Sequence, residues 1–414
     1  MSGSGAGGVD VPSVSRAGDA VWRAQHREAL LAFARQSARA EGGFVWLGRD
    51  GRPEPGRGIE LWINARMTYV FALSSLLGQE SDLPLAEHGV DALTELLADP
   101  LHGGWFDEVG LDLSVPSTRK ACYGHAHVVM ASAVACAAGA AGGRELFEDA
   151  CTVHESRFWD PSVGLCREEL SRDWTAVDPY RGANSNMHTV EAYLFAADVS
   201  GDTVWLERAL SIAGRLVDVH ARAHDWRLPE HYDDAWTPLP EYHRDRPADP
   251  FRPFGATPGH AFEWSRLLLQ LGRSLPDAPA WVVEASAALF RQAAVDGTED
   301  GSAGLVYTTD WSGTPVVRER FHWVMCEAVL AAEAWHAHAG LDEHATLARR
   351  WWDEIAGYFV DETTGAWRHE LAPDLGESSR TWVGRPDAYH AFNALTLPDL
   401  PLAPSPAVTA SGAR

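Results

Sequence analysis

Titratable side chains recur at the beginnings of predicted helices in this chain of 414 residues. His260 and Glu263 lie three residues apart, so both side chains project from one helix face, where the carboxylate can support the imidazole. His390 follows a Pro-Asp pair near the end of the chain. Two imidazoles on opposite sides of a substrate suit proton abstraction next to a carbonyl, because each exchanges a proton near neutral pH. The predicted catalytic residues therefore include His260, Glu263 and His390.

Polar residues at two further helix starts complete this candidate site. Arg66 offers a fixed positive charge for a developing enediolate oxygen, although a salt bridge with Glu60 or another carboxylate at the core rim is an alternative role. Asn184 and His188 are spaced i and i+4, so they share one helix face and can bind sugar hydroxyls. Their alternative roles are a helix cap and a buried, hydrogen-bonded histidine. We predict that Arg66 is catalytic and that Asn184 and His188 bind substrate.

The chain is rich in indole and imidazole, with 18 tryptophans and 18 histidines. Most tryptophans in proteins pack in the core, but several here lie at the same helix starts or in long loops. That placement indicates a surface on which a sugar ring can stack. The aromatic residues predicted to contact substrate are Trp62, Tyr123, Trp323 and Trp382.

Metal and cofactor motifs are not found in the sequence. Two His-Ala-His segments, 125–127 and 336–338, place their imidazoles on different helix faces, so neither pair is expected to chelate one ion. The five cysteines are scattered and include no CxxC pair, which favours reduced thiols and a cytoplasmic location. Phosphate-binding loops, HExxH and GxSxG are also absent. We therefore predict neither a bound metal nor a cofactor.

The candidate site residues recur at long, nearly regular intervals along the chain. Helical periodicity predicts twelve helices, which pair across short turns, while long loops separate the six pairs. Each helix after a long loop opens with a polar marker, and the markers are 61, 61, 72, 62 and 68 residues apart. The markers are Arg66, His127, His188, His260, His322 and His390. Six helical hairpins can bury every apolar face by closing into an all-α (α/α)6 barrel, with the markers converging at one mouth.

The net charge and the sequence of the chain ends limit the kinds of partner that we expect. Lys and Arg number 34 against 58 Asp and Glu, a net charge of −24 that disfavours nucleic acid and anionic lipid. The longest apolar stretch has 14 residues, too few to span a bilayer, and the N-terminus does not resemble a signal peptide. We predict a flexible leader (1–18), one barrel domain (19–400) and a flexible tail (401–414). The expected partner is a monosaccharide, and a homo-oligomer remains open.

Five segments, in order along the chain, resemble the N-acylglucosamine 2-epimerase superfamily. They are ELWINARMT (60–68), KACYGHA (120–126), NSNMHTVEA (184–192), TPGHAFEW (257–264) and RPDAYH (385–390). The resemblance covers about residues 20–398 and is strongest to aldose–ketose isomerases of mannose or sulfoquinovose. It implies a metal-free reaction through a cis-enediolate. In this scheme His390 moves the proton between C2 and C1, His260 acts opposite it with support from Glu263, and Arg66 holds the enediolate oxygen.

The substrate is less sharply defined by the sequence. We favour D-mannose and D-fructose, with D-lyxose and D-xylulose as a further pair. Sulfoquinovose isomerases tend to carry Gln where this chain has Pro386, but Arg252 could hold a sulfonate. A sugar 2-epimerase is a second alternative. Glycoside hydrolysis needs two facing carboxylates, for which Glu263 and Asp387 are the nearest candidates, and a peptide-binding helical scaffold is more remote.

Overall fold

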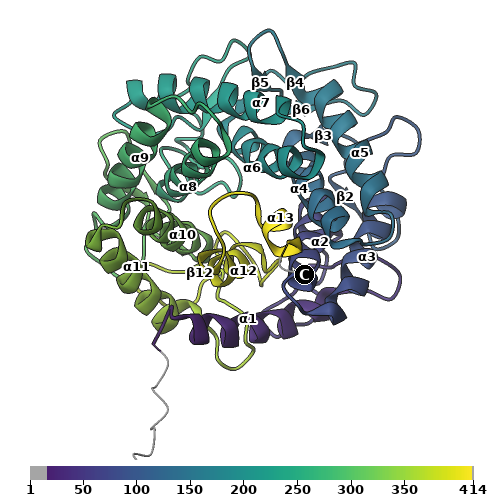
Figure 1. Ribbon diagram of the computed structural model, residues 1–414, viewed down its shortest axis with the longest axis horizontal. Coiled ribbons are helices and arrows are strands. Elements are labelled where there is room, and N and C mark those ends of the chain that lie inside the picture. Colours follow the sequence, from purple (N-terminus) through teal and green to yellow (C-terminus); the bar gives the residue numbers. More distant parts are fainter. Residues whose placement is uncertain (1–15, 413–414) are drawn as a thin grey trace, which may run out of the picture.

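The computed structural model describes residues 16–412, and its helices form two concentric rings (Figure 1). The inner helices are α2 (Leu61–Leu76), α4 (Cys122–Ala138), α6 (Ala183–Ser200), α8 (Pro258–Ser274), α10 (His322–Ala339) and α12 (Tyr389–Thr396). The outer helices are α1 (Ala20–Ala34), α3 (Leu83–Asp91), α5 (Gly143–Val153), α7 (Val204–Ala213), α9 (Trp281–Gly297) and α11 (Asp342–Glu354). Each inner helix contacts the next, and α12 contacts α2, so the ring is closed. The predicted (α/α)6 barrel is confirmed.

The sequence patterns of the two rings differ because their environments differ. Inner helices contact neighbours on all sides, and every residue of α2 is buried. Outer helices have one face in water, and α11 buries only His344, Ala348, Trp351 and Trp352. Four outer helices end in π-helical turns, at Ala92–Leu96, His154–Phe158, Gly214–Ala221 and Ile355–Phe359.

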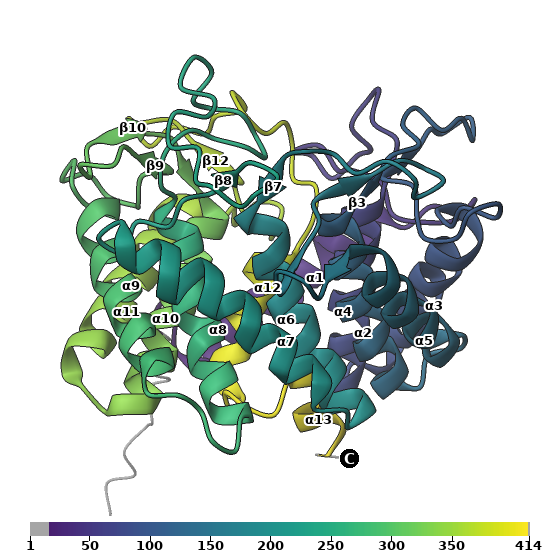
Figure 2. The ribbon, with the colours of Figure 1, turned by 90° about the horizontal axis from the view of Figure 1, so that it is seen from above.

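Short strands tie the hairpins together at one end of the barrel (Figure 2). The strand before an inner helix pairs antiparallel with the strand that follows the next outer helix. These pairs are β1 (Ile59–Glu60) with β2 (Glu108–Val109), β3 (Lys120–Ala121) with β6 (Glu169–Leu170), β7 (Arg181–Gly182) with β8 (His231–Tyr232), and β11 (Arg320–Phe321) with β12 (Glu370–Leu371). Two local pairs complete the set, β4 (Trp159–Asp160) with β5 (Leu165–Cys166) and β9 (Thr308–Thr309) with β10 (Pro315–Val317). These strands hold the inner-helix starts in register around the mouth.

The chain ends differ in part from the sequence prediction. Helix α13 (Pro406–Ser411) lies within the expected tail, and it packs against α2, α4 and α6 at the end opposite the strands (Figure 2). Its Pro406, Ala407 and Ala410 are buried, so apolar burial holds part of this segment against the barrel. Except for residues 16–18, the expected leader lies outside the described residues. None of the described helices is long and apolar enough to cross a membrane.

Candidate active site

A cavity opens at the strand end of the barrel, and residues from the beginnings of all six inner helices line it. The lining residues are Trp62, Arg66, Tyr123, Asn184, His188, Pro250, Phe251, His260, Glu263, Tyr307, Phe321, His322, Trp323, His369, Trp382, Pro386, Asp387 and His390. The structure thus brings together every residue predicted for the site except Arg252. Of the six helix-start markers, only His127 does not line the cavity. Its ring lies behind those of His188 and Tyr123, with centroids 4.6 and 4.8 Å away.

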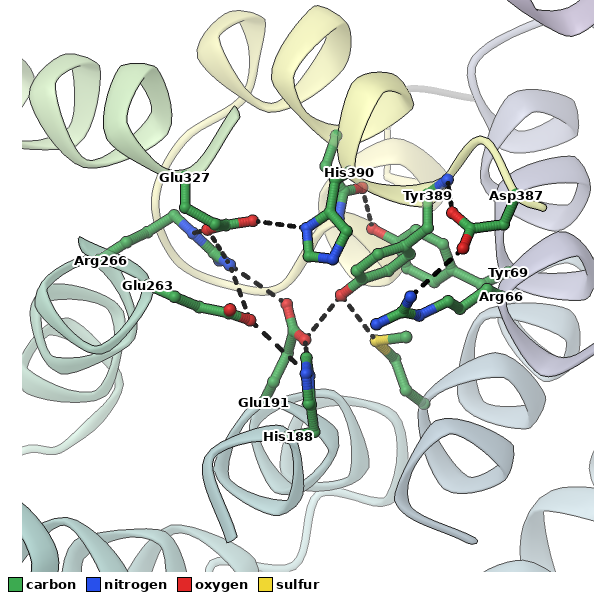
Figure 3. Close-up of polar contacts among 12 residues, drawn as sticks. Arg66, Tyr69, His188, Glu191, Glu263, Arg266, Glu327, Asp387, Tyr389 and His390 are labelled. Carbon is green, nitrogen blue, oxygen red and sulfur yellow. Dashed lines mark hydrogen bonds and ion pairs between the residues drawn. The ribbon is translucent and has the colours of Figure 1, made fainter. Parts of the chain in front are cut away.

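His390 is built to act as a neutral base. Its Nδ1 lies 3.0 Å from Oε1 of Glu327 on α10, which leaves Nε2 as the nitrogen available to a substrate (Figure 3). Burial and the nearby Arg66 charge lower the pKa of His390 well below its ordinary value. The imidazole is therefore neutral at neutral pH, and the Glu327 carboxylate can stabilise the imidazolium that forms when a proton is taken.

His260 is oriented by a carboxylate that the sequence did not identify. Its Nδ1 lies 2.9 Å from Oε1 of Glu230, which directly precedes β8. The expected support from Glu263 is therefore wrong, because the Glu263 carboxyl lies in the centre of the ring beside His188, 3.7 Å from its Nδ1 (Figure 3). His260 instead faces the mouth, where the loop carrying Glu230 meets it. The two predicted imidazoles thus each have a carboxylate partner, Glu230 and Glu327.

Below the cavity floor, three carboxyl groups surround Arg266 of α8 (Figure 3). Arg266 Nη2 lies 3.2 Å from Glu327, 3.4 Å from Glu191 and 4.0 Å from Glu263. Glu191 also accepts a hydrogen bond from the Tyr389 hydroxyl at 2.6 Å, and its pKa is held low by His188 and Arg266 despite burial. One arginine cannot balance three buried negative charges, so one carboxyl must stay protonated.

Glu263 is the carboxyl of the three that best fits the protonated state. Burial and the neighbouring Glu327 and Glu191 charges raise its pKa well above the ordinary value. Neither of its oxygens has a hydrogen-bond partner within residues 16–412. A neutral carboxylic acid that lines the cavity can donate a hydrogen bond to a substrate oxygen.

Arg66 supplies the fixed positive charge at the opposite wall. Its Nη1 lies 3.3 Å from Asp387 Oδ2, and its Nη2 donates to the Tyr123 hydroxyl at 2.9 Å. Burial opposes this charge, but Tyr123 and Asp387 raise the pKa of Arg66 overall. Its salt-bridge partner is Asp387, so the ion pair expected with Glu60 or another carboxylate at the rim forms with the latter kind of residue. Glu60 instead accepts a hydrogen bond from the Trp62 indole.

Aromatic rings form the walls of the cavity. The Trp323 ring lies beside both imidazoles, with centroids 5.1 Å from His260 and 5.8 Å from His390. Gly259 permits this packing, since a Cβ atom there would clash with the Trp323 ring. Trp62 and Trp382 approach each other at 6.2 Å, and both contact Phe251, which the sequence analysis did not select. These rings give the cavity apolar faces between its polar groups.

The two residues predicted to bind hydroxyls both reach the cavity. Asn184 Oδ1 is buried and has no hydrogen-bond partner among the residues that the structure describes. His188 Nδ1 lies 3.4 Å from Glu191 Oε2. Burial lowers the pKa of His188, so this ring is also neutral at neutral pH. An open amide oxygen and a neutral imidazole suit the recognition of sugar hydroxyls.

Arg252 lies outside this cavity, contrary to its predicted place in the site. It lines an adjoining outer cleft, where its guanidinium lies 4.0 Å from the centroid of the Tyr180 ring and 3.7 Å from Glu169. The loop from 240 to 257 carries it past the cavity wall, while Phe251 of the same loop points to the site. Within residues 16–412, Arg66 is the single Lys or Arg that lines the cavity.

Two groups of described side chains place three possible metal-ligand atoms within 4.8 Å of one another. One, His188 with Glu191 and Glu263, lies under the cavity, but the Arg266 cation already occupies the space beside both carboxyls. The other, Cys122 with His154 and Cys166, lies in the barrel wall. The His125 ring bonds to the backbone, since its Nδ1 lies 2.7 Å from Ala121 O and its Nε2 accepts from Trp105 N.

Comparisons with known proteins agree on one family. The model of the N-acylglucosamine 2-epimerase (GlcNAc 2-epimerase) family matches residues 42–394. A D-mannose isomerase from Thermobifida fusca is 46% identical over 94% of this chain and 97% of its own. One from Pseudomonas cannabina pv. alisalensis is 44% identical over 94% and 95%. A crystal structure of a D-mannose isomerase superposes with a TM-score of 0.86 at 26% identity over 93% and 98% of the two chains. Cellobiose 2-epimerase from Spirochaeta thermophila DSM 6192 shares the fold, with a TM-score of 0.79 at 21% identity over 91% and 95%.

Proposed function

Because the chain belongs to the N-acylglucosamine 2-epimerase family, we propose that it is an aldose–ketose isomerase that interconverts D-mannose and D-fructose. The observation that carries this proposal is the identity of 44% to 46% with two D-mannose isomerases over 94% of the chain. The cavity supports it, since two oriented imidazoles and one buried arginine suit proton transfer next to a carbonyl. A cytoplasmic location suits the five free cysteines.

In the proposed mechanism His390 moves the carbon-bound proton. Its neutral Nε2 takes the proton from C2 of open-chain mannose, and the two electrons of the C–H bond form the C1–C2 double bond of a cis-enediolate. The imidazolium then returns a proton to C1, which gives fructose. Glu327 orients the ring through Nδ1 and stabilises the imidazolium between these two steps.

The remaining groups stabilise the substrate oxygens or exchange protons with them. Arg66 stabilises the negative charge that develops on the enediolate. His260, held by Glu230, assists ring opening, protonates O1 and accepts the proton of the O2 hydroxyl, so that a carbonyl forms at C2. Glu263 donates a hydrogen bond to a substrate oxygen as a neutral acid. Trp62, Trp323 and Trp382 stack against the sugar while Asn184 and His188 bind its hydroxyls.

The alternatives fit the cavity less well. A sulfonate would need a second cation, and Arg252 lies in the outer cleft against Tyr180 and Glu169. Glycoside hydrolysis would need an ionised carboxylate and a carboxylic acid across the sugar ring. Asp387 is held in an ion pair by Arg66, however, so among the described residues no free carboxylate lies opposite the Glu263 acid. D-lyxose and D-xylulose remain compatible substrates, since they differ from the mannose pair away from C1 and C2.

A substrate panel in heavy water tests the proposal. We expect mannose to give fructose with deuterium at C1, because the proton on His390 exchanges with solvent before it returns to carbon. Lyxose should react more slowly, and sulfoquinovose, glucose and N-acetylglucosamine should react little. NMR measures both the products and the position of the label. Glucose as the main product from mannose would show a 2-epimerase, and unchanged mannose beside a cleaved disaccharide would show a hydrolase.

The pH dependence follows from the two perturbed groups. His390 must be neutral to accept a proton, and its pKa is lowered, so activity should fall on the acid side only below the ordinary histidine value of 6.5. Glu263 must be protonated to donate, and its pKa is raised, so the alkaline limb should lie well above the ordinary glutamate value of 4.5. We expect kcat/KM to reach its maximum between the two limbs. An acid limb centred above pH 6.5 would contradict the role of His390.

A further inference from the structure

A buried group of sulfur and nitrogen atoms lies in the barrel wall, apart from the candidate active site. Cys122 opens α4, His154 lies in the π-helical turn after α5, and Cys166 lies on β5. All three are buried, with exposed fractions of 1% or less. Their ligand atoms lie within 4.8 Å of one another, and none of the three residues lines the cavity. The fold therefore gathers residues that are scattered in the sequence.

The spacing of these atoms matches a tetrahedral metal site. Zinc bonds of about 2.3 Å to sulfur and about 2.0 Å to nitrogen imply tetrahedral edges of roughly 3.6 Å from sulfur to nitrogen. Cys122 Sγ lies 3.6 Å from His154 Nε2. The Thr189 hydroxyl oxygen completes a third corner, 3.6 Å from Cys122 Sγ and 3.4 Å from His154 Nε2. Cys166 Sγ lies within 4.8 Å of the other two ligand atoms, so a shift of at most about 1 Å would close the tetrahedron.

Surrounding hydrogen bonds prepare the ligands. The His154 Nδ1 lies 3.1 Å from the Tyr193 hydroxyl. A neutral ring that donates through Nδ1 presents the Nε2 lone pair to the cluster. Thr189 donates its hydrogen to Ser185 O at 2.8 Å, which leaves oxygen lone pairs free. Asn186 holds the Cys166 backbone through two hydrogen bonds, of 2.8 and 3.1 Å.

We propose that Cys122, His154 and Cys166, with Thr189 as the fourth ligand, bind one Zn²⁺ ion as a structural site. Binding releases the two thiol protons to solvent, and two thiolates balance the charge of the ion. The resulting unit is neutral, which removes the main cost of placing an ion in a dry wall. The ion would fasten α4, α6, β5 and the end of α5 together. It would also fix the residue beside Tyr123, which bonds to Arg66 in the cavity.

The test measures zinc directly and does not depend on isomerase activity. Because every ligand is buried, loading should accompany folding. The full chain is therefore unfolded under reducing conditions, refolded with and without Zn²⁺, desalted and analysed for metal. We expect about one zinc per chain and a higher Tm for the loaded protein. Refolding with Co²⁺ should give thiolate-to-cobalt charge-transfer absorption.

Serine variants locate the ion. Cys122→Ser and Cys166→Ser should lose the zinc and the absorption band. The matched controls Cys136→Ser and Cys151→Ser, whose thiols lie away from the cluster and are partly exposed, should retain both. If the first two variants do not fold, the cobalt spectrum of the wild-type protein alone decides whether thiolates bind the metal. The proposal is overturned if wild type shows no thiolate band, if Cys122→Ser keeps its zinc, or if mass spectrometry finds a disulfide between Cys122 and Cys166 in the refolded protein.

Discussion

Replacing His390 by Asn is expected to lower kcat for mannose isomerisation by about 10³-fold or more. General bases raise reaction rates by roughly 10²- to 10⁴-fold, and no other group is placed to move this proton both from C2 and to C1. The Asn amide can still donate to Glu327, as His390 Nδ1 does at 3.0 Å, so the fold should persist. KM should change little, since the lost interaction concerns the transition state. Initial rates of fructose formation and the deuterium content of recovered mannose measure both effects.

Two companion variants separate base catalysis from general damage to the barrel. His125→Asn alters another buried imidazole of the inner ring, outside the cavity, and should lower Tm while the folded protein keeps its kcat. Glu327→Gln keeps His390 but removes the charge that stabilises its imidazolium, so kcat should fall by about 10²-fold with a shifted acid limb. If His390→Asn retains more than a tenth of the wild-type kcat, His390 is not the base.

The sequence predicted the ring because the inner helices carry two signals at once. Residues such as Arg66, His188 and His390 mark the helix starts at nearly constant spacing, and continuous apolar runs follow them. A closed double ring satisfies both signals, since it buries the apolar runs and brings the helix starts together at one mouth. The same logic placed Asn184 and the three tryptophans at the mouth, where the structure has them.

The carboxylate partner of His260 could not be predicted from helical spacing, because the two residues lie on different elements of the structure. Glu230 lies 30 residues earlier and reaches His260 through the pairing of β7 with β8. A second repeat could have revealed it. The first amide of four inner helices donates to the carbonyl of Asp107, Glu168, Glu230 or His369, and the first three of these are 61 and 62 residues apart. Two members of this second set lie beside the first set, since Glu230 contacts His260 and the His369 ring stacks on His322 at 3.8 Å.

Other misassignments come from side-chain direction. Glu263 shares a helix face with His260, but its carboxyl lies beside His188 and Arg266, at 3.7 and 4.0 Å. His188 and Glu191 have the same spacing of three residues, and there the two side chains do meet, at 3.4 Å. Equal spacing therefore does not determine whether two side chains meet, because residues of other helices also decide where each side chain lies. Arg252 was misplaced for a related reason, because sequence spacing does not show where a side chain in a long loop points.

Arg66→Lys is expected to lower kcat by about 10² to 10³-fold, the usual cost of removing a preorganised group that stabilises an oxyanion. Lysine keeps one positive charge, but it cannot bond to Asp387, Tyr123 and a substrate oxygen at once, as the planar guanidinium can. The shorter ammonium should settle on Asp387, so that the enediolate loses its counter-charge while the fold keeps its ion pair. Arg227→Lys, at the ion pair of Arg227 and Asp296 away from the cavity, is the matched control and should leave kcat unchanged.

The contrast between kcat and KM distinguishes this role from a structural one. If Arg66 stabilises the enediolate, kcat and kcat/KM fall together while KM stays near the wild-type value. Solvent exchange at C2 should fall in parallel, because proton abstraction and charge stabilisation occur in the same step. A purely structural arginine would instead lower Tm and the amount of active protein, with normal exchange per active molecule. Normal kcat in Arg66→Lys would show that the ammonium serves equally well and that the planar shape of the guanidinium has no part in the reaction.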